Sequence, residues 1–147
     1  MVLHLLEAGG LDAGGLRSLL NQDCGLAGMA GGPGDVRALL ASDAPEARLA
    51  LEVYGYRARK YLGAYLAALG GCDAVLIGGG AGEGSAALRA MIVAGLEPLG
   101  LVLDADANRD AKANRRISDG ASAIEVWVMR TDEEAILARE AAAWLAQ

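Results

Sequence analysis

AVLIGGGAGEGS, residues 74–85, places four apolar residues directly before a run of five glycines in seven positions. A short, wholly apolar run is typical of a strand buried on both faces of a parallel sheet. We expect Gly78–Gly84 to be a loop and Ser85 to cap a helix that ends near Ala94. The free backbone N–H groups of such a loop, next to a helix start, favour an anion such as a phosphate group. A tight turn without a ligand is the alternative.

Helices and strands alternate on both sides of this segment. The spacing of apolar residues predicts a helix over Pro45–Leu69, ended by Gly70, and a last helix capped by Thr131. Two further strands are expected at Leu101–Leu103 and Ile124–Met129. This order predicts an α/β fold with a small central sheet flanked by helices. The apolar stripe of the long helix would consist of Leu51, Tyr54, Ala58, Tyr61, Leu62, Tyr65 and Leu69.

Composition limits the class of protein. The 147 residues suit a single domain, and the hydrophobic content of 54% excludes intrinsic disorder. A net charge of −6 without a basic stripe argues against nucleic acid and anionic membranes as partners. No apolar run is long enough for a membrane span, and no signal peptide is expected. Cys24 and Cys72 indicate neither a disulfide framework nor a zinc site, so a cytoplasmic protein is expected.

The glycine run does not fit a P-loop but matches part of the dinucleotide-binding pattern. A P-loop needs lysine after its last glycine, but Ser85 follows here. The dinucleotide pattern G-x-G-x-x-A is matched by Gly82, Gly84 and Ala87, with Asp104 at the distance of a ribose-binding acid. The chain has no further strand–helix–strand unit to complete a dinucleotide fold. A stand-alone NAD-type domain nevertheless stays open as an alternative.

Several segments together resemble the acetate/propionate kinase family, in the order of its C-terminal half. The segments are Tyr56–Tyr65, Ala74–Ser85 and Val128–Glu134, with Gly34–Arg37 and Leu19–Gly28 upstream. Gly34–Arg37 is similar to the family's Asp-(Met/Phe)-Arg motif, and Val128–Glu134 contains its Thr-Asp-Glu-Glu motif. The resemblance covers essentially the whole chain.

The resemblance implies the C-terminal, nucleotide-binding domain of an actin-like ATPase fold over residues 1–147, with the N-terminal half absent. The family transfers the γ-phosphoryl group of ATP to a short-chain carboxylate, with Mg²⁺, and forms homodimers. It places Glu133 at the magnesium site and no catalytic residue in this chain, because the catalytic groups belong to the missing half. The nucleotide contacts it implies are Asp35, Val36, Arg37, Gly80, Ala81, Gly82, Glu83 and Gly84.

The same resemblance implies partners for the chain. The carboxylate would bind through the missing domain, so the chain alone is expected to be inactive. The expected partner is a second copy in a homodimer or a separately encoded N-terminal half. A non-catalytic dimerisation module, with Tyr54, Tyr61 and Tyr65 as its interface, is a further alternative.

Three positions depart from the family pattern. Gly84 stands where the family usually has asparagine, Arg130 where it has proline, and Val36 where it has methionine or phenylalanine. Each change is expected to weaken nucleotide binding. Two of the implied site residues also have a simpler interpretation, since Asp35 fits a helix cap and Glu133 fits an acid in the first turn of a helix.

Overall fold

The computed structural model describes residues 1–112 and 114–145, except for the side chain of Glu133. The chain divides into two compact units, Met1–Ala58 and Arg59–Gln147, and the boundary falls within the long helix α5, Pro45–Leu69. The expected single domain over residues 1–147 stays a prediction.

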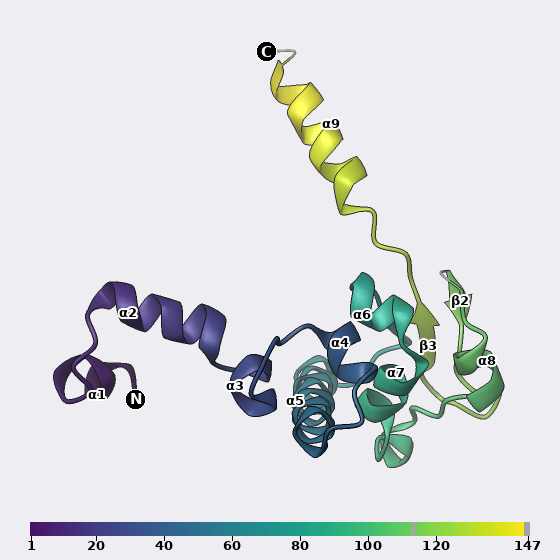
Figure 1. Cartoon of the computed structure of the whole chain (residues 1–147). Helices are drawn as coiled ribbons and strands as arrows, with labels where there is room; N and C mark the ends of the chain where they lie inside the picture. Colours follow the sequence, from purple (N-terminus) through teal and green to yellow (C-terminus); the bar gives the residue numbers. More distant parts are fainter. Residues whose placement is uncertain (113, 146–147) are drawn as a thin grey trace. The chain divides into compact units, whose positions relative to one another are not determined.

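The first unit consists of short helices and the beginning of α5 (Figure 1). Its buried apolar side chains come from three of these helices, and Leu16, Leu39 and Leu51 are among them. Many of its other apolar residues, such as Leu3 and Leu49, are exposed. The elements before α5 are α1 (Val2–Glu7), α2 (Ala13–Ser18), the π-helical segment η1 (Leu19–Asp23), α3 (Leu26–Ala30) and α4 (Val36–Leu40).

The second unit is built on a three-stranded mixed sheet with the order β1-β3-β2. The central strand pairs in parallel with β1, from Ala74 beside Glu125 to Ile77 beside Val128, and antiparallel with β2. The elements are β1 (Ala74–Ile77), α6 (Gly79–Gly84), α7 (Ala86–Val93), the 3₁₀ segment η2 (Glu97–Leu99), α8 (Ala105–Arg109), β2 (Arg115–Arg116), β3 (Glu125–Val128) and α9 (Glu133–Leu145).

One face of the sheet forms the core of this unit. Val126 and Val128 of β3 are completely buried, while Glu125 and Trp127 on the other face are half-buried, so the two faces expected for this strand are confirmed. Apolar residues of α5, α7 and the connecting segments cover the buried face. This cluster comprises Leu66, Val93, Leu96, Leu101, Ile117, Ile124, Val126 and Val128.

The prediction of a strand at Leu101–Leu103 is wrong. Within these residues Leu103 forms an isolated bridge with Ser118, and Asp104 then caps α8. The third strand is instead Arg115–Arg116, which pairs with β3. Two consecutive arginines carry no apolar pattern; the strand joins β3 through backbone pairing and through an ion pair between Arg116 Nη1 and Glu125 Oε1 (3.1 Å).

Helix α5 has the predicted bounds but not the predicted buried face. Leu51 and Leu66 are buried, whereas Tyr61, Tyr65 and Leu69 are more than half exposed. In the second half of α5, the expected apolar stripe therefore does not coincide with the face that packs against the core. No helix among the described residues combines the length and the apolar character that a membrane crossing requires.

Candidate functional site

The parallel pairing of β1 with β3 assembles the site. Strands of the same direction end at the same edge of a sheet, so the segments that follow Ile77 and Val128 are neighbours although they lie about fifty residues apart. The first of these segments is the glycine run and the second is Met129–Asp132. In α/β sheets, ligands commonly bind outside the carboxyl ends of the strands.

The glycine run is a helix rather than the expected loop. Gly78 is extended, Gly79 has a φ of +77°, and α6 covers Gly79–Gly84. Four of these six residues are glycines, and glycine disfavours a helix by about 1 kcal/mol relative to alanine. Such a segment has little helical tendency of its own, so contacts with the rest of the unit must hold it.

Thr131 provides the first of these contacts. Its hydroxyl accepts a hydrogen bond from the backbone N–H of Gly79 (3.1 Å) and donates one to Glu83 Oε1 (2.8 Å). Its backbone N–H also donates to Glu83 Oε1 (2.8 Å). The three hydrogen bonds join both ends of α6 to the segment after β3, and we call them the Thr131 clasp. Thr131 was expected to cap α9, but Asp132 does so, because its Oδ1 accepts from the N–H of Ala135 (2.9 Å).

The Thr131 clasp stabilises the ionised form of Glu83. The backbone N–H of Thr131, followed by its hydroxyl, stabilises the carboxylate and lowers the pKa of Glu83 below its usual value of about 4.5. The positive charge of Arg130 acts in the same direction with a smaller effect. Glu83 is therefore ionised at neutral pH and acts as a hydrogen-bond acceptor.

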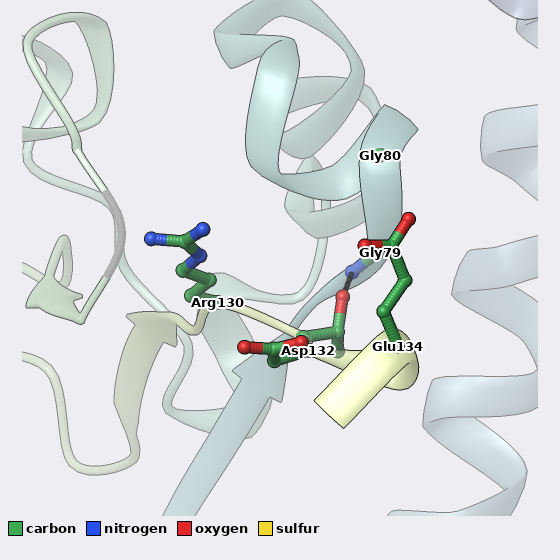
Figure 2. Close-up of a pocket in the computed structure, with 6 residues that line it drawn as sticks. Gly79, Gly80, Arg130, Asp132 and Glu134 are labelled. Atoms are coloured by element: carbon green, nitrogen blue, oxygen red, sulfur yellow. Dashed lines mark hydrogen bonds between the residues drawn. The ribbon is translucent and has the colours of Figure 1, made fainter. Parts of the chain in front are cut away.

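A pocket of about 410 Å³ lies beside the clasp. Figure 2 shows its wall, with Glu134 extending toward Gly79 and with Arg130 and Asp132 on the same segment. One cation and two carboxylates thus face a surface of bare backbone, which a ligand can approach closely. The lining residues are Gly79, Gly80, Arg130, Thr131, Asp132 and Glu134.

The predicted glycine-run residues have different positions around this pocket. Gly80 lines it, Ala81 is half-buried, and Glu83 belongs to the clasp. Gly82 is buried, and a Cβ there would lie 2.8 Å from Ile77 Cγ2. Gly84 is exposed, and a Cβ there would meet nothing within 4 Å. Their contact with a nucleotide stays a prediction.

Asp35, Val36 and Arg37 form the start of α4 in the first unit. Asp35 caps this helix by accepting a hydrogen bond from the N–H of Ala38 (2.9 Å), as its simpler interpretation had it. Asp35 and Arg37 are exposed and Val36 is half-buried. A role for these three residues in binding adenosine stays a prediction.

The proposed magnesium residue, Glu133, is the first residue of α9, but its side chain lies outside the described residues. Among the residues that are described, no three His, Cys, Asp or Glu side chains come together as a metal site would require. The assignment of Glu133 to a metal therefore stays a prediction.

The dinucleotide alternative does not match the local structure. Its pattern needs the first glycines in a tight turn between strand and helix. Gly82 and Gly84 instead lie in the second half of α6, and Ala87 lies in α7. The carboxylate of Asp104 is used as a helix cap, because it accepts from the N–H groups of Asp106 and Ala107.

Sequence reasoning missed four residues of the pocket wall, Arg130, Thr131, Asp132 and Glu134, as neighbours of the glycine run. The signal was present in the two apolar strands, because parallel pairing of Ala74–Ile77 with Ile124–Met129 puts their carboxyl ends together. The hydroxyl of Thr131 was assigned to its own helix, although tertiary bonds to Gly79 and Glu83 use it.

Comparisons with known proteins give a consistent result. The model of the acetokinase family matches residues 1–139. The acetate kinase of Solibacter usitatus is 44% identical over 136 residues, which cover 89% of this chain and 33% of that protein. The acetate kinase of Bacteroides fragilis is 42% identical, with coverage of 98% and 37%. The chain thus spans about a third of the length of these relatives.

Solved structures show the same fold. Porphyromonas gingivalis acetate kinase superposes with a TM-score of 0.85 and 34% identity, over 98% of this chain and 37% of that one. A propionate kinase from Francisella tularensis gives 0.82 and 28%, over 94% and 36%. The predicted fold class is confirmed: an α/β domain of the actin-like ATPase fold, with a small sheet flanked by helices.

The pair Gly82→Ala and Gly84→Ala tests the packing of α6 on β1. In G82A the new methyl group must displace Ile77, and we expect a loss of about 1–3 kcal/mol in the free energy of unfolding, typical of overpacking. G84A adds its methyl group in open space and should be neutral or slightly stabilising. Urea unfolding followed by tryptophan fluorescence reports on the second unit, which contains both Trp127 and Trp144. Equal stability of the two variants would contradict this packing.

The Thr131 clasp should make α6 sensitive to acid. A carboxyl group with a lowered pKa in the folded state stabilises that state above its usual pKa, and this contribution is lost as pH falls through the lower value. We therefore expect the protection of the amides in residues 79–84, measured relative to their intrinsic exchange rate at each pH, to fall below about pH 4.5. Glu83→Gln should exchange faster already at pH 7 and show a weaker pH dependence. Thr131→Ser, which keeps the hydroxyl group, is the control. Wild-type exchange in E83Q would show that the charge of Glu83 does not stabilise α6.

Proposed function

Because this chain belongs to the acetokinase family, whose model matches residues 1–139, we propose that it forms the nucleotide-binding part of an acetate kinase-type phosphotransferase. The chain spans about a third of its curated relatives, 33–37% of their length. We assign it to the C-terminal part of such a kinase, in agreement with the order of the motifs. The observation that carries the proposal is the pocket beside the glycine helix α6.

The proposed reaction is the reversible phosphorylation of a short-chain carboxylate. A carboxylate oxygen forms a bond to the γ-phosphorus of ATP while the bond from that phosphorus to the bridging oxygen breaks, which gives an acyl phosphate and ADP. Relatives named acetate kinase and a structure titled propionate kinase support acetate and propionate as substrates. Catalysis of such transfers rests mostly on positioning and on neutralising charge.

The geometry of the pocket supports a phosphate chain. Its volume of about 410 Å³ lies within the range of roughly 300–1,000 Å³ typical of small-molecule sites. Gly79 and Gly80 present backbone without a side chain, and Arg130 adds a positive charge. In this proposal Gly80, Ala81, Gly82, Glu83 and Gly84 form the wall of the nucleotide site. Asp35, Val36 and Arg37 would contribute on the adenosine side.

The donor set of the pocket is suited to Mg²⁺. This ion prefers oxygen ligands, keeps several waters, and binds through one or two carboxylates together with substrate phosphates. Glu134 and Asp132 supply carboxylates at the pocket, and Glu133 lies between them in sequence. We assign Glu133 as the magnesium residue. When bound, the ion would neutralise charge on the β- and γ-phosphates.

The acceptor side of the reaction is assigned to another chain or segment. The carboxylate would bind in an N-terminal domain, which a separately encoded chain could supply, and the protein would act in the cytoplasm, as a homodimer or with that second chain. The exposed aromatic residues Tyr61 (57%) and Tyr65 (63%) on α5 supply surface for such an association, and also favour the second candidate, a dimerisation module. Light scattering at increasing protein concentration separates a dimer from a monomer.

Ligand titration tests the nucleotide assignment. A ligand that binds only the folded state raises its stability, by about 2.7 kcal/mol at a hundred times Kd. We expect ATP with Mg²⁺ to raise the melting temperature and NAD at the same concentration to leave it unchanged. Gly84→Asn should bind ATP about five-fold more tightly if its amide adds one hydrogen bond of about 1 kcal/mol, with Gly84→Ala as the control. No response to ATP, or an equal response to NAD, would remove the proposal.

The chain alone should not catalyse phosphoryl transfer, because no carboxylate-binding or catalytic residue is assigned to it. Acyl phosphate formed from acetate and ATP can be trapped with hydroxylamine and measured as the coloured iron complex. We expect no turnover above the blank. A rate near 1–100 s⁻¹, typical of kinases, would show that the acceptor site lies within these residues.

A further inference from the structure

The side chain of Arg89 is buried at the junction of α6, α7 and α8. It comes from the fourth residue of α7 and is only 1% exposed, less than almost any other side chain of its size. It does not line the pocket. Neither the sequence motifs nor the proposed nucleotide site gives it a role.

Its guanidinium group makes four hydrogen bonds to two separate segments. Nη1 donates to the backbone carbonyls of Gly82 (2.8 Å) and Glu83 (2.9 Å) at the end of α6. On the other side, Nε donates to Asn108 Oδ1 (2.7 Å) and Nη2 to the carbonyl of Asn108 (2.6 Å). Asn108 is itself buried, and its Nδ2 donates to the carbonyl of Ala86.

No carboxylate pairs with Arg89 among the described residues, and the acceptors of its hydrogen bonds are carbonyl and amide oxygens. Burial therefore lowers the pKa of Arg89 from its usual value. A buried cation without a counter-ion is costly to desolvate, and an apolar side chain would fill the space at lower cost. The guanidinium fork contributes something that an apolar residue cannot, namely several directed bonds at once.

Helix α6 needs bonds of this kind at its C-terminal end. The last four carbonyls of a helix have no partner within the helix, and in a six-residue helix this is most of them. Arg89 satisfies the carbonyls of Gly82 and Glu83, and the Thr131 clasp holds Gly79 and the Glu83 side chain. A helix with four glycines in six residues is thus held by side chains from elsewhere in the second unit.

We propose that Arg89 is the positioning residue of the pocket: by anchoring the end of α6 to Asn108, it keeps the backbone of Gly79 and Gly80 turned toward the ligand without touching it. The ligand part of this inference rests on the proposed nucleotide function, but the anchoring of α6 does not. Loss of the guanidinium group should therefore loosen residues 79–84 and weaken ATP binding together.

The test compares Arg89→Ala with Arg59→Ala. Arg59 is the matched control, because this half-buried residue also donates through its guanidinium to a backbone carbonyl, that of Met91 in α7 (2.6 Å), rather than to one of α6. We expect hydrogen exchange in residues 79–84 to rise at least ten-fold in R89A and ATP affinity, measured by calorimetry with Mg²⁺, to fall at least ten-fold. Both should recover toward wild type when methylguanidinium fills the space left by the side chain. In R59A both should stay within two-fold.

The outcomes separate the two proposals. A folded R89A with wild-type exchange in residues 79–84, or one that methylguanidinium does not restore, overturns the role of Arg89. If the wild-type chain does not bind ATP but R89A still loosens residues 79–84 reversibly, the nucleotide function fails and the anchoring stands. If R89A does not fold, Arg89→Lys carries the test: an ammonium group cannot reach all four acceptors, so wild-type exchange in R89K overturns the inference.

Discussion

A helix composed mainly of glycine is unstable by itself, and the candidate site depends on the tertiary hydrogen bonds that stabilise α6. The four glycines of α6 add no side-chain packing, and each loses more backbone entropy on folding than another residue would. Its stability is supplied from outside, by Thr131 at one side and by Arg89 at the other. Because Gly79 and Gly80 carry no side chains, their backbone is accessible at the pocket, and the bonds from Thr131 and Arg89 hold it there.

The sheet makes those external bonds possible. Parallel pairing of β1 with β3 brings Gly79 next to Thr131, and the buried face of the same strands fixes the two segments with Val126 and Val128. Helices α7 and α8 complete the arrangement on the other side through Arg89 and Asn108. Elements that are far apart in the sequence thus determine the shape of a six-residue segment.

The parts predicted well from the sequence are those governed by local pattern. Helix α5 has its predicted bounds, because apolar spacing and the terminal glycines act locally, and the two-faced strand at Glu125–Val128 follows from simple alternation. Helix α6 could not be predicted, because the bonds from Thr131 and Arg89 that oppose its low propensity are tertiary. The strand Arg115–Arg116 has no apolar signal, since it joins the sheet through backbone pairing to β3. The hydroxyl of Thr131 was predicted to cap its own helix, because its actual hydrogen bonds, to Gly79 and Glu83, are also tertiary.

The acceptors of Arg89 on α6 are main-chain oxygens, and these are identical in every amino acid. Exchange of the side chains at positions 83 and 84 therefore leaves the acceptors of this anchor in place. Insertion or deletion of a residue between Gly79 and Arg89 would instead shift the carbonyls out of register with the guanidinium fork. The anchor from Arg89 thus depends on the length of the segment, whereas the packing of Gly82 and the bonds of Glu83 to Thr131 depend on its composition.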